Sequence, residues 1–235
     1  WTGLTGTSVA DSLTYDGSQY TYAVTATNAT GGAAHTSAAV SRPFKATGKP
    51  AAWGAWTAKP TGANGQLSLT YTVPPSRGGQ STVTLTGAGG TRTMANGSGT
   101  SATTFSGIVI GGLTNGQAYG MQLRVCNEGG ACSTSGTVTA TPYGPLGEPS
   151  LTASAKGDGF TWSASGNGNG RNAVLRVSDS VGTPSTQGAG ALSLGPTSRT
   201  VGHSKTVTIT ATLSDPAGGR ASQSKSVTVT TDPPP

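Results

Sequence analysis

Apolar and polar residues alternate along several short stretches of this chain. In two stretches, residues 67–73 and 119–125, the residues between the apolar ones are mostly Ser, Thr, Gly or Gln. Because a period of two places alternate side chains on opposite faces of a strand, each stretch predicts a β-strand with one buried face. The apolar positions are Leu67, Leu69, Tyr71 and Val73 in the first, and Tyr119, Met121, Leu123 and Val125 in the second.

The same pattern returns near the C-terminal end. It predicts inward side chains in two strands and a later strand over residues 227–229, with Gly, Pro and Asn clusters between them. Short alternating runs separated by turn residues are typical of an all-β chain. The inward positions are Phe160, Trp162 and Ala164 on one strand, and Val207, Ile209, Ala211 and Leu213 on the other.

Six chemically matched pairs of residues lie 99 positions apart. This repeat predicts domains over residues 1–47, 48–146 and 147–235, with Pro-rich seams at residues 42–50 and 141–149. Proline cannot donate a ladder hydrogen bond, so each seam ends a final strand and stiffens the link. The pairs are Tyr20 and Tyr119, Asn28 and Asn127, Pro43 and Pro142, Phe44 and Tyr143, Gly48 and Gly147, and Pro50 and Pro149.

Residues 113–119, Leu-Thr-Asn-Gly-Gln-Ala-Tyr, and the alternation up to Asn127 resemble the corner and penultimate strand of a fibronectin type III domain. The resemblance implies that the Tyr119 hydroxyl bonds back to the chain a few residues upstream, and that Tyr20 is the same corner in the first domain. Val207 stands where the last domain would have this Tyr, which favours a broader immunoglobulin-like sandwich there. The implied fold is a tandem array of immunoglobulin-like, fibronectin type III-like β-sandwiches.

The repeat predicts that the first of these domains is incomplete. Residues 1–50 match residues 100–149, the later half of the middle domain, which leaves an inner face of Tyr20, Tyr22, Val24 and Ala26 open to water. Unpaired strand edges favour association. We therefore expect that the chain is part of a longer one, as its start at Trp1 also suggests, or that strands of a neighbouring subunit complete the domain.

Composition narrows the function. Charged residues are 9% of the chain and hydrophobic residues 33%, which favours several small cores. The net charge is +6, but no two Lys or Arg residues are adjacent, so no nucleic-acid partner is expected. Weak attraction to anionic wall polymers stays open. No apolar run approaches the ~20 residues of a membrane span.

Cys126 and Cys132 flank a Gly-containing turn and predict a disulfide across a hairpin, in an extracellular setting. A metal site is the alternative, but neither His35 nor His203 is near in sequence, and no cofactor or metal is expected. The two Glu residues and three Asp residues in apparent turns form no cluster, so no catalytic site is expected. These are Glu128, Glu148, Asp16, Asp158 and Asp215.

Trp53 and Trp56 lie three residues apart, on opposite faces if this stretch is a strand. One then enters the core and the other packs at the seam, with a carbohydrate platform as the alternative. The tripeptide from Lys156 to Asp158 reads as a turn, with an integrin-type motif as its alternative.

These patterns predict a non-enzymatic extracellular array that acts as a spacer, adhesion or assembly stalk. The Gly-, Thr- and Ala-rich style is similar to tandem arrays on the surface of Gram-positive bacteria. Partners would be neighbouring domains, further copies, cell-wall polymers or carbohydrate, met by loops at residues 74–79, 127–131 and 215–220. Two alternatives stay open: an accessory region of a secreted polysaccharide-degrading enzyme, and a decoration or tail protein of a bacterial virus.

Overall fold

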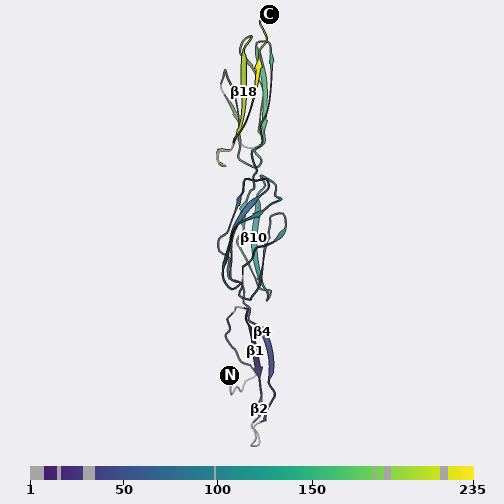
Figure 1. Ribbon diagram of the computed structural model, residues 1–235, viewed down its shortest axis with the longest axis vertical. Helices are drawn as coiled ribbons and strands as arrows, with labels where there is room; N and C mark the ends of the chain where they lie inside the picture. Colours follow the sequence, from purple (N-terminus) through teal and green to yellow (C-terminus); the bar gives the residue numbers. More distant parts are fainter. Residues whose placement is uncertain are drawn as a thin grey trace. The chain divides into compact units, whose positions relative to one another are not determined.

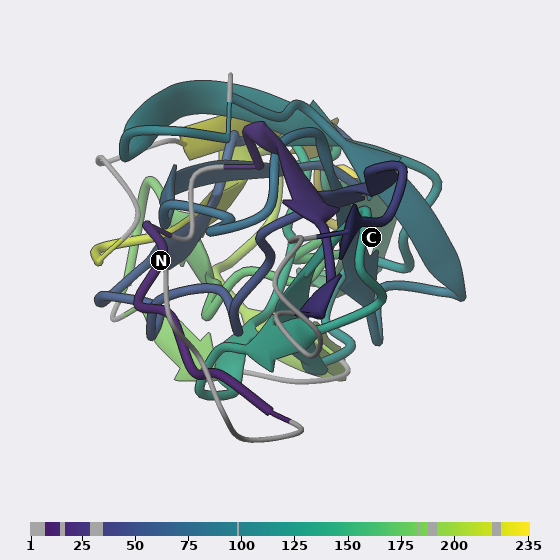
Figure 2. The same ribbon diagram turned by 90° about the horizontal axis from the view of Figure 1, so that it is seen from below.

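A computed structural model describes residues 8–14, 17–28, 35–97, 99–182, 184–187, 192–217 and 222–235. These residues form strands β1 to β19. Both views of the ribbon show strand arrows and no coiled helix in these residues (Figures 1 and 2). The predicted all-β fold is therefore confirmed. In the same part of the chain, no helix is long and apolar enough to span a membrane. Asp16 and residues 218–220, which entered the sequence predictions, lie outside the described residues.

The chain divides into two compact units. The first holds Trp1–Thr57, Leu69–Ile108 and Gly120–Thr139, and the second holds Ala58–Ser68, Val109–Tyr119 and Ala140–Pro235. The middle repeat, residues 48–146, contributes to both units, so the division into three domains stays a prediction.

The last sandwich lies within the second unit and has two antiparallel sheets of order β13-β14-β17 and β16-β15-β18-β19. Its core takes side chains from both sheets, including every inward position predicted on residues 160–164 and 207–213. The later strand is longer than predicted. The strands are β13 (Ser150–Lys156), β14 (Gly159–Gly166), β15 (Val174–Asp179), β16 (Ser185–Gln187), β17 (Leu192–Thr200), β18 (Thr206–Ser214) and β19 (Ser222–Thr230).

The middle sandwich repeats this strand order, with sheets β5-β6-β9 and β11-β10-β7-β8 and with β12 also pairing β10. Leu67, Leu69, Met121, Leu123 and Val125 have no exposed surface, as their alternation predicts. The strands are β5 (Thr57–Pro60), β6 (Leu67–Val73), β7 (Ser81–Thr86), β8 (Thr91–Met94), β9 (Thr103–Ile110), β10 (Tyr119–Asn127), β11 (Cys132–Thr134) and β12 (Val138–Ala140).

Both sandwiches thus place strands one, two and five in one sheet and strands three, four, six and seven in the other, if β11 and β12 count as one strand. Seven strands in two antiparallel sheets are typical of the immunoglobulin-like class. The last sandwich has this order although Val207 replaces the corner tyrosine, because alternating apolar residues of the strands, not the corner, build its core.

Hydroxyl groups form a ladder on the outer face of β18 and β19. Four cross-strand pairs join Thr or Ser side chains at 2.8–3.2 Å. Cross-strand pairs of this kind stabilise a sheet without charge, which explains how a chain with so few ionic residues keeps a polar surface. The pairs are Thr206 with Thr230, Thr208 with Thr228, Thr210 with Ser226, and Thr212 with Ser224.

The described part of the first segment forms two small sheets, β1 (Gln19–Val24) with β4 (Val40–Lys45) and β2 (Thr27–Asn28) with β3 (His35–Thr36). Figure 1 labels β1, β2 and β4 at this end of the chain. Of the residues described between positions 8 and 45, none is buried. Of the inner face predicted to be open, Val24 and Ala26 are exposed, and Tyr20 and Tyr22 are half-buried.

Candidate functional site

The hairpin between β10 and β11 contains the predicted disulfide. Cys126 and Cys132 are opposite each other in the antiparallel register and are bonded, with Cα atoms 4.1 Å apart. Both residues are half-buried. The bond closes a loop of five residues, 127–131, and so fixes the geometry of the turn.

Asn127 organises this hairpin, a role that the sequence predictions missed. Its side-chain nitrogen donates to the carbonyl oxygens of Gly48 (2.6 Å) and Ser76 (2.9 Å), and its oxygen accepts from the Ala131 amide (3.1 Å). The residue is 6% exposed, and its polar atoms are satisfied by these bonds. The match of Asn127 with Asn28 in the repeat was the signal available in the sequence.

Glu128 follows in the turn and is bound on both oxygens. Lys45 donates to Oε2 at 2.6 Å and the Gln80 amide donates to Oε1 at 3.0 Å. The Lys45 hydrogen bond, followed by the Gln80 bond, holds the pKa of Glu128 below its usual value. Both charged groups are exposed enough for water to compete, which suits a structural contact better than acid–base chemistry.

The loops predicted to meet partners, at residues 74–79, 127–131 and 215–220, each include a buried polar residue in their described part, and their binding role stays a prediction. Ser76 is fully buried and its hydroxyl donates to the Gly79 and Gly99 carbonyls. Asp215 is 3% exposed and pairs with Arg171 at 3.2 Å. Polar residues in these Gly- and Pro-rich turns thus anchor the loops to the sandwiches.

The corner tyrosine of the middle sandwich makes the bond that the resemblance implies. The Tyr119 hydroxyl accepts from the Thr114 amide at 2.9 Å and donates to the Gln117 side chain at 3.3 Å. For Tyr20, the position matching Thr114 is residue 15, outside the described residues. Its role as a corner stays a prediction.

The tryptophans do not lie on a strand, which corrects the sequence prediction. Residues 51–56 precede β5, and both indoles turn toward the same segment: Trp53 donates to the Ser133 carbonyl and Trp56 to the Gly136 carbonyl, each at 3.0 Å. Trp56 is buried and Trp53 half-buried. Indole nitrogens bonded to the backbone in this way close the end of a core.

The two histidines lie on different elements. His35 is exposed on β3, and the Nδ1 of His203 lies 3.1 Å from the Asp232 carbonyl. Within the described ranges, no three His, Cys, Asp or Glu side chains gather as metal ligands would. Glu148 is exposed and lies 3.7 Å from Lys225, and exposed Asp158 lies in the turn between β13 and β14, where a turn was predicted.

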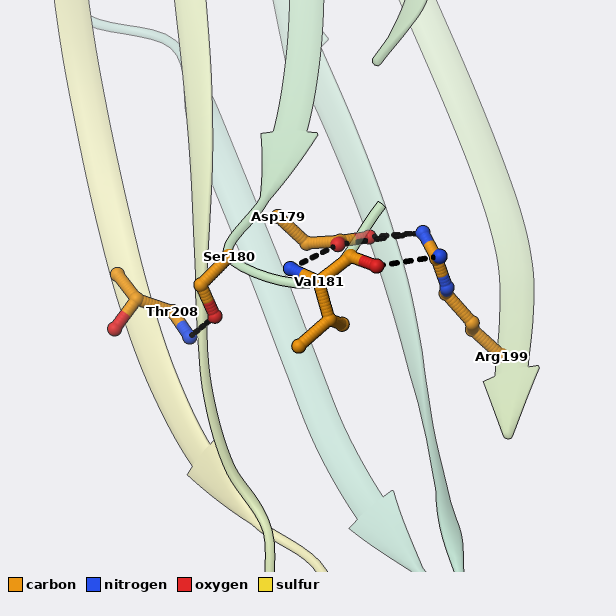
Figure 3. Close-up of polar contacts among 5 residues, drawn as sticks. All are labelled: Asp179, Ser180, Val181, Arg199 and Thr208. Carbon is orange, nitrogen blue, oxygen red and sulfur yellow. Dashed lines mark hydrogen bonds and ion pairs between the residues drawn. The ribbon is translucent and has the colours of Figure 1, made fainter. Parts of the chain in front are cut away.

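A shallow depression of about 270 Å³ lies beside that turn, lined in part by Lys156, Asp158 and Arg199. Figure 3 shows that Arg199 is already engaged: it donates to the Asp179 carboxylate at 3.0 and 3.3 Å and to the Val181 carbonyl at 2.9 Å. The Val181 amide donates to Asp179 in turn. The guanidinium therefore ties β17 to the turn after β15, and the depression gathers no catalytic set.

One face of β1 and β4 gathers apolar and aromatic side chains of the first segment. Opposed residues share a face, and here Tyr20 is opposite Phe44 and Val24 opposite Val40. The Phe44 ring stacks with the rings of Tyr20 and Tyr22, at 6.0 and 5.3 Å between centroids. Val24, Val40 and Phe44 are 68%, 60% and 39% exposed.

A hydrogen bond fixes the edge of this aromatic face. The Tyr22 hydroxyl donates to the Asp11 carboxylate, and this bond raises the pKa of Tyr22. In the middle repeat, the positions matching Tyr22 and Val24 are Met121 and Leu123, both without exposed surface. The face of β1 thus matches a core face of the middle repeat, and no second sheet covers it in the part of the first segment that the structure describes.

The fold and these contacts define an all-β chain of immunoglobulin-like, fibronectin type III-like sandwiches. No family model and no curated protein matches it. Among solved structures, the chain is similar to the FN1-FN3 domains of chicken CNTN1, with 13% identity over 91% of this chain and 76% of that chain and a TM-score of 0.33. The human OSCAR ligand-binding domain is 14% identical over 77% and 96%, with a TM-score of 0.28. Similarities at this level give no information on function.

Proposed function

We propose that the chain is a non-enzymatic, extracellular module of a bacterial surface protein that acts as a spacer and adhesion or assembly stalk. The observation that carries this proposal is the succession of two sandwiches with the same strand order along one chain. Repeated modules that share a fold are a common way to build extended binding surfaces. The fold alone hosts many functions, so the chemistry of the surface has to be considered beside it.

The surface chemistry supports an extracellular setting. A disulfide at Cys126 and Cys132 persists in oxidising compartments. The outer face of β18 and β19 is covered by paired hydroxyls instead of charges. The polar side chains described above mostly anchor loops and turns, which supports a role without catalysis.

The open face of β1 and β4 supports a role in assembly. This face carries stacked aromatic rings and exposed valines. In other proteins, added strands cover such features where a strand edge is left unpaired. Strands of a neighbouring domain or of a second copy are the partners of this proposal. Cell-wall polymers are secondary partners, attracted by the net charge of +6.

Two measurements test the proposal. Antibodies against the chain should label intact producing cells, and purified chain should sediment with isolated Gram-positive cell walls. Label confined to virus particles, or to a secreted polysaccharide-degrading enzyme, would replace the proposal with one of these alternatives. Turnover in a screen of glycosidase, esterase and peptidase substrates that is lost in His35→Ala or His203→Ala would overturn the non-enzymatic assignment.

A further inference from the structure

Three asparagines that are far apart in the sequence meet in the second unit. The Asn169 side-chain nitrogen donates to Asn64 Oδ1 at 2.7 Å, and the Asn115 nitrogen donates to Asn169 Oδ1 at 2.7 Å and to Asn64 Oδ1 at 3.1 Å. Each residue therefore contacts both others. The three residues belong to the loop after β5, the loop before β10 and the loop between β14 and β15.

The same asparagines hold the backbone around them. Asn115 Oδ1 accepts from the Gly65 amide at 2.8 Å, and the Asn169 nitrogen also donates to the Pro145 carbonyl at 2.9 Å. The Asn169 carbonyl accepts from the Gly144 amide at 2.9 Å. The Gly116 amide, next to Asn115, donates to the Pro142 carbonyl at 2.9 Å. Residues 142–145, part of the segment between β12 and β13, are therefore bonded to the loops of Asn115 and Asn169, and through the Asn169 side chain to Asn64.

Two glycines permit this close approach. A Cβ on Gly144 would lie 1.9 Å from Asn64 Oδ1 and 2.2 Å from Asn169 Nδ2, and one on Gly170 would lie 2.4 Å from the Gly116 nitrogen. Asn169 itself has φ of 51°, a left-handed conformation that Asn adopts more readily than most residues. The backbone is thus shaped to place the Asn169 amide between the two distant loops.

A buried cation secures the same linker from the other side. Arg171 donates from Nε to the Gly144 carbonyl at 2.5 Å and from Nη1 to Asp215 at 3.2 Å, and its guanidinium lies 4.2 Å from the centre of the Tyr143 ring. The side chains of Arg171 and Asp215 are 9% and 4% exposed. A charge at this depth is stable only while its partners stay in place.

We infer that Asn64, Asn115 and Asn169 couple the opening of the loop after β5 and of the loop before β10 to the opening of the linker at residues 142–145. The reason is that linked hydrogen bonds of side chains strengthen one another, so the loss of one member weakens the bonds of the others. Losing one asparagine weakens the hold on all three segments. This coupling between successive repeats does not depend on the proposed function.

Amide hydrogen exchange in the full chain tests the inference. Asn169→Gly keeps the left-handed backbone accessible and removes the side chain. Exchange at the Gly65 and Gly116 amides should then accelerate by about tenfold to about a hundredfold, since several hydrogen bonds of the network are lost. The matched control is Asn167→Gly, which removes only a local bond to the Asn169 amide and should change these rates by about twofold or less.

Equal rates at Gly65 and Gly116 in wild type and Asn169→Gly, or equal acceleration in both variants, would overturn the inference. A double-mutant cycle gives a second test: Asn64→Ala and Asn169→Gly should have non-additive effects on unfolding although they lie 105 residues apart. Additive effects would contradict coupling. If Asn169→Gly does not fold, Asn64→Ala alone should accelerate exchange at the Gly144 amide, and an unchanged rate there would overturn the inference.

Discussion

The first segment and the last sandwich use the same kind of strand pair with opposite results. β1 and β4 pair over six residues and β18 and β19 over nine, all antiparallel. Yet Val24 on β1 is 68% exposed, whereas Val207 on β18 has no exposed surface. The difference is the second sheet, β13-β14-β17, which covers β18. Pairing satisfies the backbone, but only a second layer makes a core.

The largest expected effect comes from the ion pairs of the last repeat, where a buried pair and an exposed pair can be compared. Asp215→Ala removes the carboxylate that balances the charge of the buried Arg171 guanidinium. Chemical denaturation should show a loss of about 3–5 kcal/mol in the free energy of unfolding. The matched control is Glu148→Ala, since its pair with Lys225 is exposed and long at 3.7 Å. This control should cost less than about 0.5 kcal/mol. An equal cost for both variants would contradict the burial argument.

A pair of valine truncations sharpens the comparison directly. Val207→Ala removes two methyl groups from a filled core and should destabilise the last sandwich by about 2–3 kcal/mol. Val24→Ala removes the same atoms from an exposed face and should change stability by less than about 0.5 kcal/mol. Thermal melting of both variants measures the difference. A large effect at Val24 would show that its face is covered.

The disulfide is a difference between the first segment and its counterpart in the middle repeat. Thr27 occupies the position that matches Cys126, so the first segment lacks the cross-link. Reduction should destabilise the middle sandwich by about 2 kcal/mol on the chain-entropy account of a small loop. Mass spectrometry should show native protein two hydrogens lighter than the reduced form. Free thiols in native material, or loss of the last sandwich on reduction, would contradict this.

Tyr119→Phe probes the corner that the middle sandwich has and the last one lacks. The Thr114 amide loses its acceptor, but it is exposed and water replaces part of the bond. We expect a loss of about 0.5–1.5 kcal/mol in thermal or chemical unfolding. The matched control is Tyr143→Phe, whose ring stays over Arg171. If Tyr119→Phe has no larger effect than the control, the hydrogen bond of the corner tyrosine does not stabilise the middle sandwich.

The smallest effect concerns pH. The folded pKa of Glu128 lies below its unfolded value because of Lys45 and the Gln80 amide, so its contribution is present above the unfolded pKa and is lost as pH falls through the folded pKa. NMR titration should show the Glu128 pKa rising toward its usual value in Lys45→Gln. No change in this variant would mean that the pair between the first segment and the hairpin is absent in solution.

The alternation of apolar residues predicted the core strands well. Leu67, Leu69 and Leu123 are buried, as predicted. The prediction succeeds because a local period of two places every second side chain on the same face of a strand. The repeat likewise predicted the open face of β1. Predicting these features requires no knowledge of distant residues, except whether a second sheet is present.

The polar anchors could not be predicted in the same way. Asp215 is buried because Arg171, 44 residues away, pairs with it, and the half-buried Asn169 is held by Asn64 and Asn115. No local period marks such residues, and Asn or Asp in a turn is equally consistent with an exposed loop. The tryptophans were misplaced for a related reason, since their partners are backbone carbonyls about 80 residues away.

Hydrogen exchange along the full chain tests the central claim most directly, that the first segment is a half-sandwich without a covering layer. Amides of β1 and β4 should exchange at least about a hundredfold faster than those of β18, because opening a two-stranded sheet disrupts no core. When the strands that complete this domain are added, the amides of β1 and β4 should exchange more slowly. Protection of β1 and β4 equal to that of β18 in the isolated, monomeric chain would contradict the account.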